Sequence, residues 1–443
     1  MRSGGEAKRR GRQAVLAVLA AAAVLGMSVP AAAMPLPTSG PAASTTPSTD
    51  HCPYRIHTPP AVDTSEVVAP GATTPTPLPV PDKPLGGERL GACGIITDPA
   101  AGPVPPRLTS AGWLIADLDS GRIIAAKDPH GRYRPASTIK LLLAMVALDE
   151  LDLNTVVTPT PEDWGMEGDS CGMGPGGHYT NRDMLTGLLV VSGNDCANVL
   201  TRELGGHNAT LAKMNAKARS LGALDTRAAS PSGLDAPGMS TSPYDLAVIF
   251  REAMRNSTFR DMISKREYRF PGYPKRPDVP GDTDHPAYQM ATSNHLLLEE
   301  DPGVLGGKTG YTDDARKTFV GAVRRDGRSI LIVQMFGLTV ENDSYWDQAR
   351  SMIDYGLRAP ADVRIGTLDG GSARSADPSA ASGSTPTENS VAPTDSPADA
   401  VARGSGADRG WSWSVRLVIG LVCAIVVLIL ISIALSLTSR RRR

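Results

Sequence analysis

Three short motifs in the sequence bring together residue types that could carry out nucleophilic chemistry. In chain order they are Ser137-Thr138-Ile139-Lys140, Ser192-Gly193-Asn194 and Lys308-Thr309-Gly310. A serine hydroxyl is a weak nucleophile unless a neighbouring base takes its proton. Ser137 and Lys140 are three positions apart, so on a helix both side chains share one face. Because a lysine removed from water beside other cations can lose its proton, the spacing predicts Ser137 as nucleophile and Lys140 as base.

The second motif supplies groups that could assist this pair. The hydroxyl of Ser192 is suited to moving a proton between Lys140 and a departing amine. The amide of Asn194 offers both a donor and an acceptor, so it can hold the lysine amine and a substrate amide at the same time. We expect this motif to lie at a junction between two helices.

The third motif is suited to binding an anionic group of a substrate. Lys308 and Thr309 together form a cationic, hydroxyl-bearing anchor for a carboxylate, and Gly310 allows the backbone to approach a ligand closely. We expect this motif on a strand at an edge of a sheet. Each motif alone occurs by chance in many chains, but all three in this order form a specific signal.

The elements around the motifs are predicted from hydrophobic periodicity. Strands are expected at 113–118, 123–126, 318–323 and 330–336, and helices at 138–151, 181–191, 194–204, 211–221, 243–254 and 344–357. Ser137 near a helix start has backbone N–H groups aimed at developing negative charge. Strands at both ends of a helical middle predict a mixed α/β fold, an antiparallel sheet flanked by helices with an inserted helical subdomain.

These residues resemble a known family, the serine-type D-alanyl-D-alanine carboxypeptidases among the low-molecular-mass penicillin-binding proteins. The similarity extends over about residues 112–337 and is strongest at 135–140, 191–195 and 307–312. The connecting segments 232–234 and 292–297 are also typical of the family. The resemblance implies a β-lactamase/transpeptidase-like fold, and it implies neither a metal nor an organic cofactor.

The resemblance also implies a reaction. Ser137 would attack the carbonyl carbon between the two terminal D-alanines of a peptidoglycan stem pentapeptide, with Lys140 as base. Ser192 would help to protonate the departing D-alanine, and the third motif would bind the terminal carboxylate. The backbone N–H groups of Ser137 and Tyr311 would form the oxyanion hole. β-Lactam antibiotics, which mimic D-Ala-D-Ala, would act as inhibitors that acylate Ser137 and leave slowly.

Other functions fit the motifs less well. A class A β-lactamase normally has Asp at the position of Gly193 and needs a glutamate to activate the deacylating water. No Glu lies between Glu203 and Glu252, where that residue would fall. A catalytically silent ectodomain that senses peptidoglycan or penicillin would not need an intact catalytic set. Endopeptidase or transpeptidase activity stays open, because only the scissile bond or the acyl acceptor differs.

The two ends of the sequence predict export and a membrane anchor. Residues 1–33 combine a basic start, an apolar run and a small-residue cleavage site, as in a signal peptide. Residues 415–438 could form an apolar transmembrane helix, and the basic tail at 439–443 is expected to stay in the cytoplasm. The predicted location is the cell membrane, with a single span and an extracytoplasmic catalytic domain.

Composition predicts one folded domain between two linkers. Residues 34–106 are rich in proline, and residues 361–410 contain no aromatic side chain. Such segments bury too little apolar surface to offset the entropy lost on folding. A low-complexity arm at 34–106 and a disordered linker at 359–414 are therefore expected on either side of a domain at 107–358. The formal net charge of −1 excludes a general binder of nucleic acids or other polyanions.

Four of the five cysteines fall in the part expected to be exported. Cys52, Cys93, Cys171 and Cys196 can form two disulfides in three ways, and proximity in sequence favours Cys52–Cys93 and Cys171–Cys196. The sequence contains no C-x-x-C, no H-E-x-x-H and no His-rich cluster. A metal site is therefore not expected.

Overall fold

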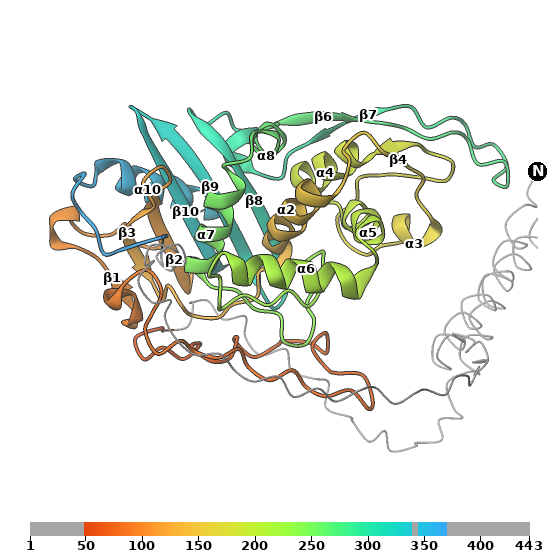
Figure 1. Ribbon diagram of the computed structural model, residues 1–443. Coiled ribbons are helices and arrows are strands. Elements are labelled where there is room, and N and C mark those ends of the chain that lie inside the picture. The colour runs from red at the N-terminus through yellow and green to blue at the C-terminus, as the bar shows by residue number, and fades with distance from the viewer. Residues whose placement is uncertain (1–47, 339–343, 370–443) are drawn as a thin grey trace, which may run out of the picture. The chain divides into compact units, whose positions relative to one another are not determined.

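A seven-stranded sheet lies at the centre of the part of the chain that the computed structural model describes, residues 48–338 and 344–369. Its strands follow the order β1-β3-β2-β10-β9-β8, with β11 beside β3 and each pairing antiparallel (Figure 1). The strands are β1 (Ile95–Ile96), β2 (Gly112–Asp117), β3 (Arg122–Lys127), β8 (Val304–Thr312), β9 (Arg316–Arg325), β10 (Arg328–Gly337) and β11 (Gly366–Thr367). The four predicted strands are confirmed as β2, β3, β9 and β10.

Helices pack on the sheet and form a helical layer beside it (Figure 1). The helices are α2 (Lys140–Glu150), α3 (Pro161–Trp164), α4 (Asn181–Val190), α5 (Asn194–Glu203), α6 (His207–Ser220), α7 (Pro243–Ala253), α8 (Ser257–Ile263), α9 (His295–Leu298) and α10 (Tyr345–Arg358). Short 3-10 segments are η1 (Glu88–Gly91), η2 (Pro99–Ala101) and η3 (Ala136–Ile139). Two small sheets pair β4 (Val156–Val157) with β5 (Tyr179–Thr180) and β6 (Glu267–Phe270) with β7 (Tyr288–Ala291). The predicted helices and the helical insertion are confirmed, whereas these four short strands were not predicted.

Both faces of the sheet are covered, as the alternation along β2 shows. Leu114 and Ala116 belong to an apolar cluster shared with α2 and α7. Trp113 and Ile115 belong to a second cluster shared with α10. Because successive residues of a strand point to opposite faces, a strand between two helical layers is apolar at nearly every position. This explains the uninterrupted apolar runs in the sequence.

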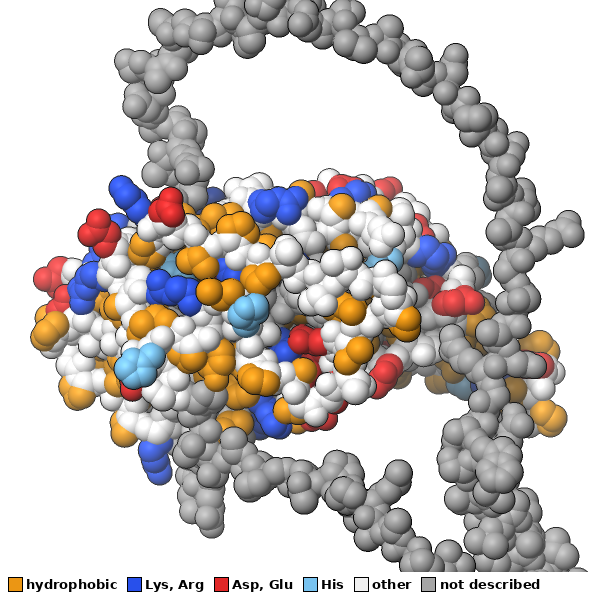
Figure 2. All heavy atoms as spheres, turned by 90° about the horizontal axis from the view of Figure 1, so that it is seen from below, with side chains coloured by type: hydrophobic (Ala, Val, Ile, Leu, Met, Phe, Trp, Pro, Cys, Tyr) orange, Lys and Arg blue, Asp and Glu red, His pale blue; other side chains and the backbone are white. Residues whose placement is uncertain are grey.

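The Pro-rich arm, residues 48–106, is folded against the domain. Its ends are joined by the predicted disulfide Cys52–Cys93, Leu90 is fully buried, and β1 pairs with β3. Seen from below, the molecule shows hydrophobic side chains scattered among polar and charged ones (Figure 2). The prediction of a low-complexity linker is therefore wrong for residues 48–106, and residues 34–47 lie outside the described residues.

A buried arginine of the domain holds the middle of the arm. The guanidinium of Arg132 donates to the carbonyl oxygens of Ile56 at 3.1 Å, Leu78 at 2.7 Å and Pro79 at 3.0 Å. The side chain of Arg132 is only 2% exposed. Proline has no N–H group, so a proline-rich segment offers carbonyl acceptors with few competing donors. Arg132 supplies the donors that these carbonyls need.

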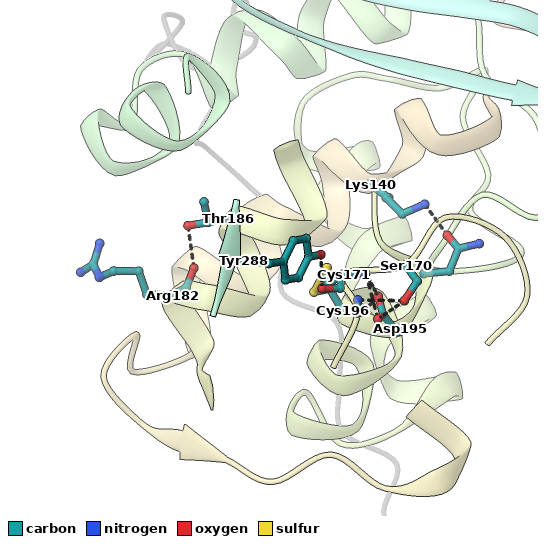
Figure 3. The surroundings of a disulfide bond; sticks show 10 residues. Lys140, Ser170, Cys171, Arg182, Thr186, Asp195, Cys196 and Tyr288 are labelled. Atoms are coloured by element: carbon teal, nitrogen blue, oxygen red, sulfur yellow. Dashed lines mark hydrogen bonds between the residues drawn. A yellow bond between two sulfur atoms is a disulfide. The ribbon is translucent and has the colours of Figure 1, made fainter. Parts of the chain in front are cut away.

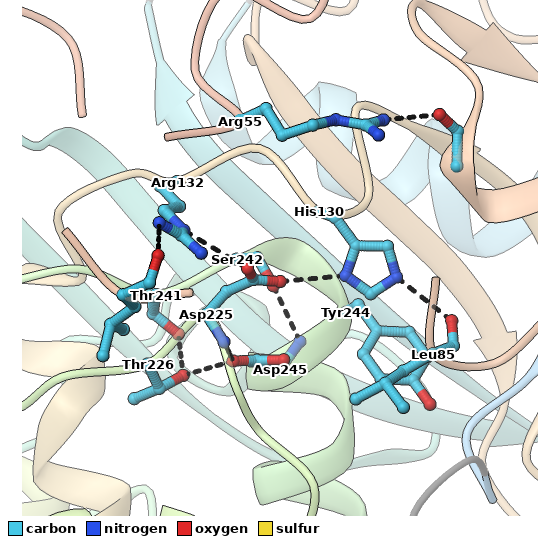
Figure 4. A network of polar contacts seen from close by, with 12 residues as sticks. Arg55, Leu85, His130, Arg132, Asp225, Thr226, Thr241, Ser242, Tyr244 and Asp245 are labelled. Atoms are coloured by element: carbon cyan, nitrogen blue, oxygen red, sulfur yellow. Dashed lines mark hydrogen bonds and ion pairs between the residues drawn. The ribbon is translucent and has the colours of Figure 1, made fainter. Parts of the chain in front are cut away.

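The same network continues through His130 and two buried carboxyl groups (Figure 4). The ring of His130 lies 3.1 Å from the carbonyl oxygen of Leu85 in the arm and 2.9 Å from the carboxylate of Asp225. Burial opposes the charged imidazole, but the contact with Asp225 outweighs it and raises the pKa of His130. Burial, and then the charge of Asp225, raises the pKa of Asp245 to about 8. Burial and the neighbouring carboxylate thus both favour the neutral form of Asp245.

The folded part also continues past the predicted C-terminal boundary. β11 pairs with β3, and the backbone N–H of Thr367 donates to the carbonyl of Gly86 in the arm at 2.9 Å. The linker predicted to start at 359 is therefore wrong for residues 359–369. Residues 370–414 lie outside the described residues.

No helix within residues 48–338 and 344–369 is long and apolar enough to cross a membrane. The predicted signal peptide at 1–33, the predicted span at 415–438 and the basic tail at 439–443 lie outside the described residues.

Candidate active site

The first motif lies where η3 passes into α2. Ser137 belongs to η3, and the fully buried Lys140 is the first residue of α2. The Nζ atom of Lys140 lies 2.8 Å from Ser137 Oγ, 2.7 Å from Asn194 Oδ1 and 2.5 Å from the carbonyl oxygen of Ser232. A neutral amine has two N–H donors and one lone pair. With the donors directed to Asn194 and Ser232, the lone pair remains for the hydroxyl proton of Ser137.

The surroundings of Lys140 favour this neutral amine. Burial lowers the pKa of Lys140 well below its usual value, and the positive charge of Lys308 lowers it further. The carboxylates of Asp169 and Asp195 act in the opposite direction but do not outweigh burial. Desolvation and a like charge both disfavour the ammonium form. Burial and the charge of Lys308 thus both favour a Lys140 amine that can accept a proton.

The second motif lies at the junction of α4 and α5, as predicted. Ser192 stands between the two helices with a φ of 66°, in the left-handed region. Strained backbone of this kind persists where the surrounding structure holds it in place. Lys308 Nζ donates to Ser192 Oγ at 2.9 Å. From the sequence, the Ser192 hydroxyl was expected to exchange a proton with Lys140. In the structure it contacts Lys308, the lysine of the third motif.

A loop of residues 167–171 orients Asn194. The side-chain Nδ2 of Asn194 donates to the carbonyl of Glu167 at 2.6 Å, and its backbone N–H donates to the carbonyl of Asp169 at 2.6 Å. Because the amide nitrogen is committed to Glu167, the amide oxygen is left to face Lys140. The predicted contact between Asn194 and Lys140 is confirmed.

The disulfide Cys171–Cys196 anchors this loop to the start of α5, in the predicted pairing (Figure 3). The carboxylate of Asp195 accepts hydrogen bonds from Ser170 Oγ at 2.6 Å and from the backbone N–H of Cys171 at 2.8 Å. The hydroxyl of Tyr288 on β7 donates to the carbonyl of Cys171 at 2.6 Å. Three kinds of contact thus hold the loop that orients the amide.

The third motif lies on β8, at an edge of the main sheet as predicted. Lys308 is fully buried, and burial lowers its pKa to about 7. Its Nζ atom also donates to the carbonyl of Thr309 at 2.8 Å. The hydroxyls of Thr309 and Ser293 lie 2.7 Å apart. A bound carboxylate would favour the charged form of Lys308, so anion binding and protonation of this amine support each other.

Two glycines let the backbone pack closely around the nucleophile. A Cβ atom on Gly310 would lie 2.8 Å from the backbone nitrogen of Ser137. A Cβ atom on Gly233 would lie 2.1 Å from the carbonyl oxygen of Ala136. Real Cβ atoms essentially never approach this closely, so β8 and the loop at 232–234 can reach Ser137 only through glycine. Tyr311 follows directly on β8, and its side chain is exposed.

The motifs share one cleft of about 340 Å³. Predicted residues in its lining are Ser137, Ser192, Asn194, Thr309, Gly310 and Tyr311, while Lys140 and Lys308 lie buried behind them. Further lining residues were not predicted from the sequence, and they include Asp169, Ser293, His295, Lys317 and Trp346. Ser293 and His295 lie in the segment 292–297. The similarity of this segment to the family was the signal in the sequence that pointed to them. The carbonyl of Ser232 was also missed, because a backbone acceptor leaves no side-chain signature.

The described residues contain one group of potential metal ligands, namely Cys171, Asp195 and Cys196. The two sulfur atoms are bonded to each other, and the carboxylate of Asp195 already accepts hydrogen bonds from the loop. Thiolates are the sulfur species that bind metals, so this group does not offer a metal site in its oxidised state.

Comparisons with known proteins agree with the site. The family model for D-alanyl-D-alanine carboxypeptidase matches residues 100–338. The chain is 47% identical over 272 residues to the D-alanyl-D-alanine carboxypeptidase DacB2 of Mycobacterium tuberculosis. The matched region covers 60% of this chain and 89% of that protein. A crystal structure of a D-alanyl-D-alanine carboxypeptidase from Mycobacterium tuberculosis H37Rv aligns with a TM-score of 0.57 and 44% identity, over 61% of this chain and 99% of that one.

The fold is also similar to that of an acyl-transferring enzyme. A mutant of the Streptomyces K15 DD-transpeptidase aligns with a TM-score of 0.52 and 25% identity, over 57% of this chain and 99% of that one. The resemblance seen in the sequence and the fold that it implied are thus confirmed. With a serine and a buried lysine in one cleft and a family match over more than half its length, this chain belongs to the D-alanyl-D-alanine carboxypeptidase family of serine peptidases.

Proposed function

We propose that the protein removes the terminal D-alanine from peptidoglycan stem pentapeptides through an acyl-enzyme on Ser137. The observation that carries the proposal is the 2.8 Å contact between Ser137 Oγ and a buried Lys140 whose donors have other partners. In the first step Lys140 takes the hydroxyl proton, and the Ser137 oxygen forms a bond to the carbonyl carbon. Backbone N–H groups of Ser137 and Tyr311 stabilise the oxyanion.

The second half of the reaction restores the serine. The C–N bond breaks as the departing D-alanine nitrogen receives a proton from Lys140, with the hydroxyl of Ser192 assisting the transfer. Water then attacks the ester carbon, gives a proton to Lys140 and releases the tetrapeptide, and Ser137 regains its proton. Thr309 in the cleft lining binds the terminal carboxylate with its hydroxyl, and the buried amine of Lys308 behind it supplies the positive charge.

The direct test measures free D-alanine from a pentapeptide that ends in D-Ala-D-Ala. We expect release by the wild-type protein, and we expect Ser137→Ala to lower it by about 10³-fold or more, as removal of a nucleophile does in serine peptidases. The matched control is Ser220→Ala, which removes an exposed hydroxyl that bonds only to the carbonyl of Lys217 and should leave the rate unchanged. Equal release by wild type and Ser137→Ala would contradict the proposal.

Penicillin binding follows from the same acyl chemistry. A β-lactam presents a strained amide and a carboxylate in the arrangement of D-Ala-D-Ala, so Ser137 is expected to open the ring and keep the acyl group. Mass spectrometry of the protein after incubation with penicillin should show the added mass on the peptide that contains Ser137. Labelling of another serine would exclude this role.

Transfer of the acyl group to an amine is a second candidate activity. It is favoured by the similarity to the DD-transpeptidase fold, since the acyl-enzyme is common to both reactions. Adding glycine as an acceptor amine distinguishes the two outcomes. Hydrolysis yields the tetrapeptide, whereas transfer yields a new pentapeptide at its expense.

We also propose that the enzyme acts outside the cytoplasm while anchored in the cell membrane by residues 415–438. Support comes from the predicted signal at 1–33 and from the two disulfides, which form in oxidising compartments. A protease added to intact spheroplasts should degrade the domain, and a truncation before 415 should release it into the medium. Protection of the domain from the protease would contradict the proposed orientation.

A further inference from the structure

The arm reaches the residue that leads into the nucleophile. Arg134 lies three positions before Ser137, and its side chain is only 1% exposed. Its guanidinium makes two parallel hydrogen bonds to Glu66 of the arm, Nε to Oε1 and Nη2 to Oε2, both at 2.6 Å. A third bond runs from Nη1 to the carbonyl of Pro59 at 2.7 Å. The arm therefore provides a hydrogen-bond acceptor for each of the three guanidinium nitrogens of Arg134.

The same stretch of the arm also holds the end of β8. Asp314 follows β8 by two residues, and its side chain is fully buried. Its carboxylate accepts hydrogen bonds from the backbone N–H of Val62 and from Ser65 Oγ, the latter at 3.2 Å. Asp314 also lies 4.0 Å from Arg134 Nε. Residues 59–66, the clip, thus connect Arg134, three residues before the nucleophile, to Asp314, two residues after the strand of the third motif.

The two segments joined by the clip are those that must be correctly spaced for acyl transfer. Thr318 on β9 donates to the carbonyl of Pro135 at 2.9 Å, so the nucleophile segment already rests on the sheet. Gly310 on β8 approaches the Ser137 nitrogen so closely that no Cβ fits between them. A shift of either segment would change the position of the oxyanion donors relative to Ser137.

A third catalytic segment ends beside the clip. Asp235 follows Ser232, whose carbonyl accepts a hydrogen bond from Lys140. Burial raises the pKa of Asp235 to about 6, the charges of Asp314 and Glu66 act in the same direction, and Arg134 opposes them. Arg134 thus bonds the carboxylate of Glu66 and lies 4.0 Å from that of Asp314, and its charge also acts on Asp235 of the 232–235 loop.

We propose that Glu66 is a positioning residue of the active site, which fixes Arg134 and so sets the spacing between Ser137 and β8. The inference rests on the proposed function, because it assigns part of the arm to the same reaction. The arm has independent attachments to the domain at Arg132 and through the pairing of β1 with β3. Loss of Glu66 therefore leaves the arm in place and disturbs the clip alone.

The test compares Glu66→Gln with wild type in two assays, D-alanine release and the second-order rate of penicillin acylation. Glutamine cannot form the charged two-point contact with a guanidinium, and displacements of about 1 Å in a catalytic site can cost about 10²-fold in rate. We expect kcat and the acylation rate to fall by about 10-fold or more, with KM within about twofold of wild type. Glu66→Asp keeps the charge and should recover part of the loss.

The control is Glu88→Gln, the same change at an exposed position of the arm, which should behave as wild type in both assays. Thermal unfolding of each variant is measured alongside. Wild-type kcat and acylation in Glu66→Gln would overturn the inference, as would a loss that Glu66→Asp does not reduce. Failure of the wild-type protein to release D-alanine would overturn the proposed function alone, because the effect of Glu66 is still measured by acylation.

Discussion

Replacing Lys140 with methionine is expected to lower the acylation rate of Ser137 by about 10²–10⁴-fold, the usual contribution of a positioned general base. Methionine fills a similar volume but has no lone pair to take the hydroxyl proton. Stopped-flow measurement of penicillin acylation reports this step separately from deacylation. The matched control is Lys213→Met, which removes a partly exposed amine paired with Glu150 at the surface.

A second variant separates the base from the charge. Lys140→Arg keeps a cation in the site, but a guanidinium stays protonated throughout the accessible pH range. We expect it to be as slow as Lys140→Met. If Lys140→Arg retained most of the wild-type rate, the lysine would act through its charge and the assignment of Lys140 as base would be wrong.

The pH dependence of the acylation rate should also show whether Lys140 acts as the base. The base must be deprotonated, so the rate rises with pH through the pKa of Lys140. Because burial and then Lys308 lower that pKa well below the usual lysine value, the rise should lie at lower pH than the titration of an exposed lysine. In Lys140→Met the rise of the rate with pH should vanish. If the rise were unchanged in this variant, it would come from the titration of another group.

Gly310→Ala is expected to lower kcat/KM by about 10²–10³-fold, comparable to the loss of one oxyanion-hole donor. Its Cβ atom would lie 2.8 Å from the Ser137 nitrogen and 2.5 Å from Thr318 Oγ1. Both contacts are closer than a real Cβ allows, so either β8 or the nucleophile segment has to move. The measurement is D-alanine release at several substrate concentrations, with circular dichroism to verify the fold.

The control for this substitution is Gly327→Ala at the turn between β9 and β10. Its Cβ would enter open space, although its φ of 74° makes alanine strained. It should lose about 1 kcal/mol of stability or more while keeping its kcat/KM. If Gly310→Ala kept wild-type kcat/KM, the close approach of β8 to Ser137 would have no catalytic role.

The sequence was sufficient to predict the groups that react but not all of those that orient them. Ser137 and Lys140 were placed together by helical spacing, and Asn194 was placed beside Lys140 by the chemistry of its amide. The carbonyls of Ser232 and Glu167, which complete the contacts of Lys140 and Asn194, could not be predicted. Any residue can supply a backbone carbonyl, so residue type carries no signal for such a partner.

The arm was misread for a physical reason. Tyr54 is its one aromatic residue, so by itself the arm could not bury enough apolar surface to offset the entropy lost on folding. In the structure the domain supplies the missing partners, since Arg132 and Arg134 are buried against it with their donors on its carbonyls. Composition indicates how much apolar surface a segment can bury by itself. It carries no information about the hydrogen-bond donors that an arginine far away in the sequence supplies.

The hydrogen bond between Thr367 and Gly86 has a consequence for the order in which the domain is completed. The two residues lie near opposite ends of the described chain, and Thr367 belongs to β11, which pairs with β3. During synthesis the arm emerges first, well before β11 exists. Pairings between such distant residues form late and slowly, so the arm gains this backbone contact only after β11 is made. Truncated chains that end before 366 are therefore the ones most exposed to misfolding and proteolysis.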